Sequence, residues 1–70
     1  MKINHPERYV GKRVRVVSLQ GTATAGQFIG YNYDYDDNGN EFVEFDVDSD
    51  SGIGYVFSEH EVKNIEIIGE

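Results

Sequence analysis

Oxygen-bearing side chains recur at short intervals in the middle of the chain, a spacing that could hold a hard cation. The opening of a calcium-binding loop, whose early ligands and central glycine wrap the ion, is matched by Asp34, Asp36 and Asn38. The twelfth position of that pattern requires a chelating glutamate, but Phe45 stands there. An acidic hairpin turn is the favoured interpretation. Calcium stays a weak candidate, and we expect no resident metal or cofactor.

A second candidate site is formed by aromatic residues on one side of an extended segment, Tyr31, Tyr33 and Tyr35. Exposed rings can stack nucleic-acid bases, and large rings equally fill the core of a small barrel. Stacking platforms usually lie in positive grooves, whereas Asp34 and Asp36 are interleaved with these rings. Packing in the core or at its rim is therefore favoured, followed by protein contact and then by base stacking.

Basic side chains gather in a third candidate site, where Arg13 and Arg15 alternate after Lys12. Such residues can neutralise phosphates, the main source of non-specific affinity for nucleic acids. The favoured interpretation is instead ion pairing across strands, because acids dominate the rest of the chain. The expected partners are acids of a later segment, Glu44, Asp46 and Asp48.

The residue types of a catalytic triad occur together at Ser58, Glu59 and His60. Consecutive residues cannot converge on one substrate atom as nucleophile, base and orienting group must. The chain contains no cysteine, which excludes disulfides and thiolate metal ligands. It also has neither a phosphate-binding glycine loop nor a nucleophile elbow. We expect a protein that is not an enzyme.

The length and the net charge of the chain limit the class of protein further. Seventy residues, 39% of them hydrophobic, predict one small globular domain over residues 1–70. The net charge of −7 divides into +4 over residues 1–30, five bases minus one acid, and −11 over residues 31–70, one base minus twelve acids. No apolar run is long enough to cross a membrane and no leader is recognisable, so we expect a cytoplasmic protein.

The chain begins with a helical pattern and continues with alternating ones. A short helix is expected over about residues 4–10, with Asn4 as its cap, Glu7 completing a capping box and Gly11 ending it. Alternation then predicts five strands, over about residues 12–18, 22–35, 41–48, 53–58 and 62–68. The Asn38-Gly39 pair indicates a hairpin turn, and residues 58–61 indicate a single tight helical turn.

Alternation also assigns side chains to the core. The residues expected on the core side are Val43, Phe45, Val47, Ile53, Tyr55 and Phe57. Val14 and Val16 share one face of the first strand, and Ile65 and Ile67 share one face of the fifth. Within the long second strand, Gly26 and Gly30 flank Phe28 and predict a bulge or bend, so that one strand serves two sheets. Ile29 shares its parity with the three tyrosines.

The predicted elements define a mainly β fold class. No connection is long enough for a crossover helix, so the five strands must be antiparallel. A sheet of this size closes most easily into a small barrel, which limits exposed edges. We therefore expect a five-stranded antiparallel barrel of the SH3-like type, preceded by the short helix.

The beginning of this pattern resembles a known family. Tyr9-Val10-Gly11-Lys12 leads into the basic strand, and Gly21, Gly26 and Phe28 follow at the spacing Gly-x4-Gly-x-apolar. Over residues 6–32 this resembles the first sequence motif of Sm-like (LSm) proteins, and residues 53–68 resemble SH3-like barrels in outline. The resemblance implies an Sm-like barrel that forms rings through its fourth and fifth strands and binds RNA.

The positions that would hold RNA differ from the family pattern. Asn32 stands where Sm-like proteins usually have an aspartate, and the following loop has no clear equivalent of their asparagine. Residues 57–61 lack the Arg-Gly or Lys-Gly pair of the second motif. The resemblance is therefore carried over for the fold and not for the RNA pocket.

Three hypotheses of function follow. The first is a non-catalytic binding module that contacts a protein partner or a second copy of itself. The second is an Sm-like RNA-binding ring. The third is an acidic mimic of nucleic acid, which would act through Asp46, Asp48 and Asp50.

Overall fold

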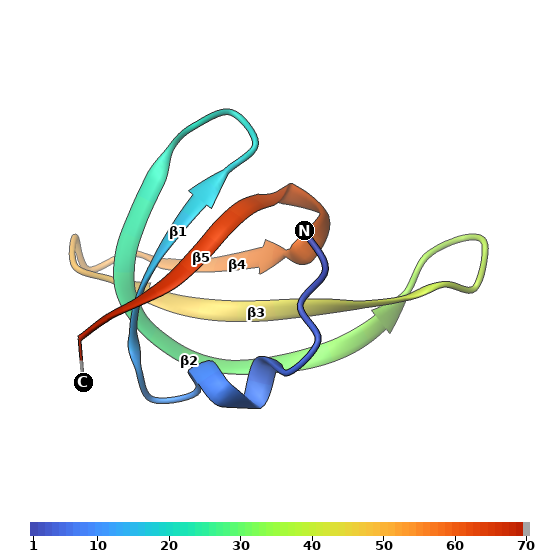
Figure 1. Ribbon diagram of the computed structural model, residues 1–70, viewed down its shortest axis with the longest axis horizontal. Coiled ribbons are helices and arrows are strands. Elements are labelled where there is room, and N and C mark those ends of the chain that lie inside the picture. The colour runs from blue at the N-terminus through green and yellow to red at the C-terminus, as the bar shows by residue number, and fades with distance from the viewer. Residues whose placement is uncertain (70) are drawn as a thin grey trace.

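Five antiparallel strands form one strongly bent sheet in the computed structural model, which describes residues 1–69 (Figure 1). The strands are β1 (Arg13–Ser18), β2 (Ala23–Tyr35), β3 (Glu41–Ser49), β4 (Gly54–Ser58) and β5 (Val62–Gly69). Their order in the sheet is β4-β3-β2-β1-β5. The predicted mainly β, five-stranded antiparallel fold is confirmed, and each predicted strand boundary lies within one residue of the observed one.

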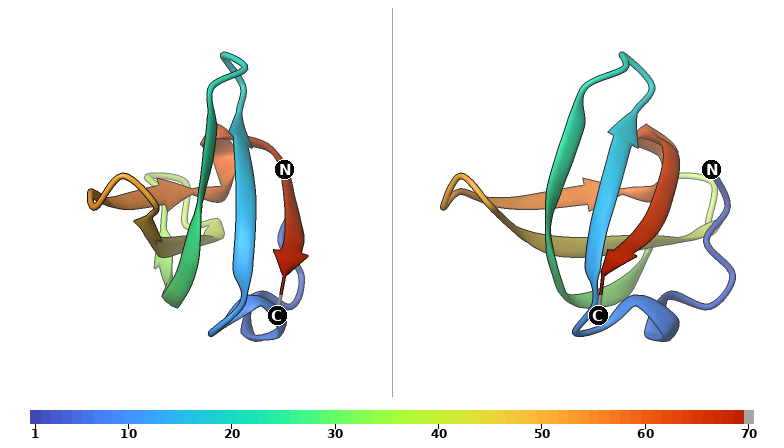
Figure 2. Two further views of the ribbon diagram at one scale, coloured as in Figure 1. Left: turned by 90° about the vertical axis from the view of Figure 1, so that its left-hand side faces the viewer. Right: turned by 60° about the vertical axis from the view of Figure 1, so that its left-hand side comes forward.

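The bend lies in β2, which belongs to both layers of the fold. Its first part pairs with β1 through Gln27, and the strand pairs with β3 from Gly26 to Tyr35. A register shift between Phe28 and Gly30 marks the predicted bulge. β1, β5 and the first half of β2 consequently run across the direction of β3 and β4 (Figure 2).

Gly26 is required where the two layers meet. A Cβ atom built at this position would overlap the carbonyl oxygen of Asp48 and lie 2.7 Å from the Cα of Ser49. Gly30, by contrast, has no atom within 4 Å of such a Cβ. Close packing therefore requires a glycine at Gly26 but not at Gly30.

The core lies between the two layers and is built from aliphatic side chains around a stack of rings. The buried hydrophobic residues are Ile3, Val14, Val16, Phe28, Val43, Phe45, Val47, Val62 and Ile65. Phe28 stacks on Phe45 with ring centroids 5.0 Å apart, and Phe57 continues the stack at 5.4 Å. Tyr9 closes its other end, 5.6 Å from Phe28.

The expected N-terminal helix is a single 3-10 turn, η1 (Pro6–Tyr9), which is shorter than residues 4–10. The predicted cap at Asn4 is wrong, because His5 precedes the turn and no side chain caps it. Glu7 lies 3.3 Å from His5 Nδ1 instead of closing a capping box. The physical reason is that Ile3 is buried and donates its N–H to the Glu59 carboxylate, which holds the segment before the turn in place.

The second predicted turn is confirmed as η2 (Glu59–Glu61), between β4 and β5. Ser58 Oγ accepts a hydrogen bond from the His60 N–H, and Glu61 Oε1 accepts one from the Ser58 N–H. These reciprocal bonds form a capping box and fix the corner of the sheet. Over residues 1–69, no helix has the length and apolar character needed to span a bilayer.

Candidate binding surfaces

The three tyrosines of β2 face the core side of the sheet but extend beyond the core. Tyr31 is opposite Phe45 and Tyr33 is opposite the buried Val43. Tyr31 is 37% exposed, at the rim of the core, whereas Tyr35 is 64% exposed. Core packing is therefore wrong for these rings, and only Tyr31 fits the rim. β1 pairs with β2 only from Ala23 to Gln27, so within residues 1–69 this part of β2 is paired with β3 alone.

The tyrosines contact one another and one acid. The rings of Tyr31 and Tyr33 meet edge to face, with centroids 5.9 Å apart. Tyr35 donates its hydroxyl to Glu41 Oε2 at 3.2 Å, and this hydrogen bond raises the pKa of Tyr35. The result is an exposed aromatic surface on the β2–β3 hairpin, and this hairpin projects from the rest of the fold in Figure 1.

Ile29 does not share the face of the tyrosines, contrary to its parity in the sequence. The register shift between Phe28 and Gly30 inserts one extra residue at this point. Ile29 therefore turns to the convex side of the sheet, where it lines a hollow with Val56 and Asp46. A bulge reverses the face of every residue beyond it, which simple alternation cannot show.

The basic residues of β1 form ion pairs, but with other acids than expected. Arg13 holds both carboxylate oxygens of Asp50, at 2.7 and 2.9 Å, and this hydrogen bonding lowers the pKa of Asp50. Arg15 lies 2.9 Å from Glu66. The predicted partners on β3 are wrong, because β1 neighbours β2 and β5 in the sheet and not β3. Both arginines are thus neutralised within the fold.

The acids of β3 form a separate outward row. Val43, Phe45 and Val47 face the core as predicted. Glu44, Asp46 and Asp48 face the convex side, and none of them forms an ion pair within residues 1–69. The predicted alternation of a buried and an acidic face is therefore confirmed for β3.

The weak calcium candidate coincides with the β2–β3 turn. Asp36 Oδ1 accepts the N–H groups of Asn38 and Asn40, each at 2.9 Å, and the Asn40 bond contributes most to lowering the pKa of Asp36. Asp34 accepts the N–H of Tyr35. Over residues 1–69, no group of three or more histidine and acidic side chains is placed to hold a metal ion.

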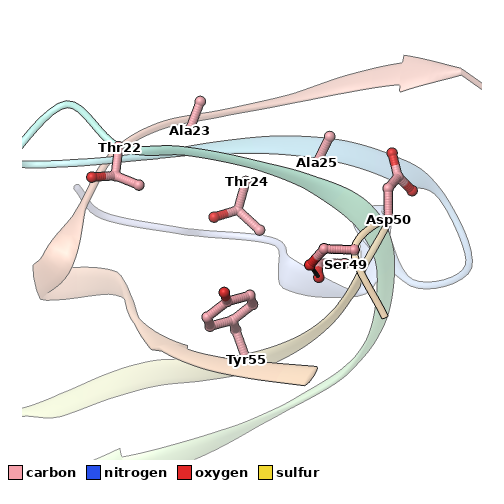
Figure 3. Close-up of a pocket in the computed structure, with 8 residues that line it drawn as sticks. Thr22, Ala23, Thr24, Ala25, Ser49, Asp50 and Tyr55 are labelled. Atoms are coloured by element: carbon pink, nitrogen blue, oxygen red, sulfur yellow. Dashed lines mark hydrogen bonds between the residues drawn. The ribbon is translucent and has the colours of Figure 1, made fainter. Parts of the chain in front are cut away.

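A polar hollow of about 270 Å³ lies between β2 and β4. Thr24 and Tyr55 face this hollow from the two layers, whereas Ala23 and Ala25 point away from it (Figure 3). Asp50 stands at its end and is already held by Arg13. The residues that line the hollow thus supply hydroxyl groups and one aromatic ring. Their one charged side chain, Asp50, is paired with Arg13.

β4 and β5 are the two edges of the sheet, and no ladder joins them within residues 1–69. Tyr55 faces inward opposite Val47 but is 40% exposed, and Ile67 faces inward opposite Val14 but is 47% exposed. Ile53 precedes β4 and is exposed as well. The predicted inward direction of Tyr55 is confirmed, but its ring is exposed because no strand within residues 1–69 pairs with the outer side of β4.

One buried acid escaped the sequence patterns. Glu59 is 2% exposed, and its carboxylate accepts the N–H of Ile3 and the N–H of Val43, each at 2.7 Å. The acid thus ties the N-terminal segment to β3. Its position in a polar turn indicates exposure, so no local signal distinguishes it from Glu61.

Searches against protein-family models, curated proteins and solved structures find no match to this chain. The class of the protein therefore follows from its own geometry. It is a small mainly β protein whose sheet has two free edges, a projecting aromatic surface and an acidic convex face.

Proposed function

We propose that this protein is a non-catalytic binding module that associates with a protein partner, or with a second copy of itself, through the free edges of β4 and β5. The observation that carries the proposal is that, within residues 1–69, β4 and β5 are each paired on one side only. Tyr55 and Ile67 face inward there and remain exposed. An added strand would satisfy the main-chain groups of an edge and cover these side chains at the same time.

The strand order supports this proposal. The fourth and fifth strands stand at opposite ends of the sheet, as ring formation by an Sm-like barrel would need. The resemblance over residues 6–32 adds to this support. A module of this kind would be expected to work as an adaptor or as a subunit of an oligomer.

Light scattering during size-exclusion chromatography tests the proposal. We expect a mass above that of the monomer, or a partner recovered by cross-linking in a cell extract. Ile67→Lys and Tyr55→Lys should abolish the association, because each replaces an exposed apolar side chain of an edge strand with a charge. Tyr35→Lys is the matched control, since Tyr35 is 64% exposed at the end of β2, where that strand pairs with β3 and not with β4 or β5. A monomeric wild type that captures no partner contradicts the proposal.

A second candidate is the acidic mimic of nucleic acid, favoured by the outward row of Glu44, Asp46 and Asp48. Asp50 does not belong to this row, because Arg13 neutralises it. Replacing Asp46 and Asp48 with asparagine should abolish binding to a basic partner, and unchanged binding would remove this candidate. RNA binding has less support, since Arg13 and Arg15 are occupied by ion pairs.

A further inference from the structure

The convex side of the sheet has a hollow of about 250 Å³ beside the free edge of β4. Its apolar walls are Ile29 and Val56, which are 52% and 68% exposed. Asp46 and Asp48 line the same hollow. Two exposed aliphatic side chains next to two carboxylates form an amphipathic surface, unlike an ordinary solvated strand face.

The register of β3 and β4 shows why Asp46 and Asp48 can be reached from the free edge of β4. Asp46 is opposite Val56, and Asp48 is opposite Gly54. A Cβ atom at Gly54 would lie 3.9 Å from Asp48 Oδ1, so the carboxylate stands beside a position that has no side chain. A strand added to β4 would lie about 4.8 Å away from it. A long side chain of that strand could cross Gly54 and reach Asp48.

The two carboxylates determine which kind of partner side chain fits this surface. Neither Asp46 nor Asp48 forms an ion pair within residues 1–69. Lysine and arginine combine a charged head with an apolar stem that packs on aliphatic surface. The stem would lie on Val56 and Ile29, and the head would lie between the two carboxylates.

On the basis of the proposed function, we infer that the edge of β4 binds an extended segment of a partner protein that carries an arginine or lysine toward the convex side. A second copy of the chain fits this edge less well. The exposed residues of β5 include a single base, Lys63, and Glu66 is already paired with Arg15, so this strand offers no arginine and one lysine to the two carboxylates. Charge complementarity therefore favours a different, basic partner.

Titration with short peptides, followed by NMR of backbone amides, tests this inference. The probe is a capped seven-residue peptide of alternating valine and arginine, compared with the same peptide carrying glutamate in place of arginine. We expect the arginine peptide to shift the amides of Gly54–Ser58 and the glutamate peptide to shift none. Shifts confined to the tyrosine surface, or equal shifts from both peptides, would overturn the inference.

Matched variants separate local recognition from overall charge. Asp48→Asn should weaken binding of the arginine peptide about tenfold, because it removes a direct charge-assisted contact. Asp37→Asn removes one charge from the exposed β2–β3 turn and should change the affinity less than about twofold. Gly54→Val should also weaken binding, since its side chain would block the path to Asp48. Equal effects of the two asparagine variants would overturn the inference.

The proposed function can survive the failure of this inference. A wild type that is oligomeric, and whose β4 amides do not respond to either peptide, would show a second copy of the chain on this edge. That result overturns the basic partner and retains association through the edges. A monomer that binds neither peptide overturns the basic partner, and the proposed function then stands or fails with the recovery of a protein partner by cross-linking.

Discussion

The two halves of β2 have the same alternation but different surroundings. From Ala23 to Gln27 the strand is paired with β1, its last two residues are also paired with the end of β3, and Phe28 just beyond is fully buried. From Gly30 to Tyr35 it is paired with β3 alone, and its inward side chains remain exposed. Alternation thus decides which face a side chain takes, whereas burial depends on an element lying across that face.

The largest expected difference between the two halves is at their inward rings. Phe28→Ala should lower the free energy of unfolding by about 4 kcal/mol, because it opens a cavity in the middle of the ring stack. Tyr33→Ala should cost a small fraction of that amount, since its ring is 48% exposed. Urea unfolding followed by circular dichroism measures both changes.

Phe28→Ala could leave too little folded protein to measure, so Phe28→Leu provides a milder variant. We expect it to cost about 1.5 kcal/mol, still more than Tyr33→Leu. Equal losses at the two positions would show that the projecting half is packed as tightly as the other, contrary to the comparison.

The two strand glycines give the next largest difference. Gly26→Ala should destabilise the fold by about 3 kcal/mol, because its new methyl group would overlap the main chain of Asp48. Gly30→Ala meets open space and should change stability by less than about 1 kcal/mol, in either direction. Thermal unfolding measures the pair, and a tolerated Gly26→Ala would argue against the close approach of the two layers.

Much of the fold was predictable because it depends on local patterns. The alternation of Val14 with Val16, and of Val43 with Phe45, identified their strands and buried faces correctly. Glycines that flank Phe28 identified the bend. In each case the neighbouring residues alone determine the backbone, so a single sequence contains the signal.

The surfaces were less predictable because they depend on long-range arrangement. The partners of Arg13 and Arg15 follow from the order of strands in the sheet, which alternation does not contain. The exposure of Tyr55 follows from the gap at the edge of the sheet. The side taken by Ile29 depends on which residue of the bend forms the bulge. The burial of Glu59 requires the N-terminal segment to pass over it.

A third prediction concerns the buried carboxylate that holds β3 beside the projecting half of β2. Glu59 binds the N–H of Val43, which is opposite Tyr33, and the N–H of Ile3 from the N-terminal segment. Glu59→Ala should cost about 2 kcal/mol, because it leaves two buried donors without partners. Hydrogen exchange should accelerate most at the amides of Ile3 and Val43.

Glu59→Gln is the sharper comparison for this contact. Its amide keeps one oxygen acceptor but directs an NH₂ group at the second donor. It should therefore release one of the two amides and protect the other. Unchanged exchange at both amides in Glu59→Ala would contradict the role of this carboxylate.

The smallest expected effect is the response of the fold to acid. Two carboxylates in turns carry this response, Asp36 between β2 and β3 and Asp50 between β3 and β4. Main-chain hydrogen bonds, above all the one from Asn40, lower the pKa of Asp36. The hydrogen bond from Arg13 lowers the pKa of Asp50. Because the unfolded chain binds protons more readily at these groups, they stabilise the fold above a pH of about 4. This contribution is lost as the pH falls through their lowered pKa values.

Acid titrations of Asp36→Asn and Asp50→Asn measure the contributions of the two turns separately. Each substitution should make unfolding less dependent on pH below about pH 4, by a small amount because both groups are exposed. Salt should weaken the contribution of Asp50, which comes from an ion pair with Arg13, more than that of Asp36, which comes from main-chain donors. Equal sensitivity to salt would mean that the two turns are held by the same kind of interaction, which the contacts of Asp36 and Asp50 do not support.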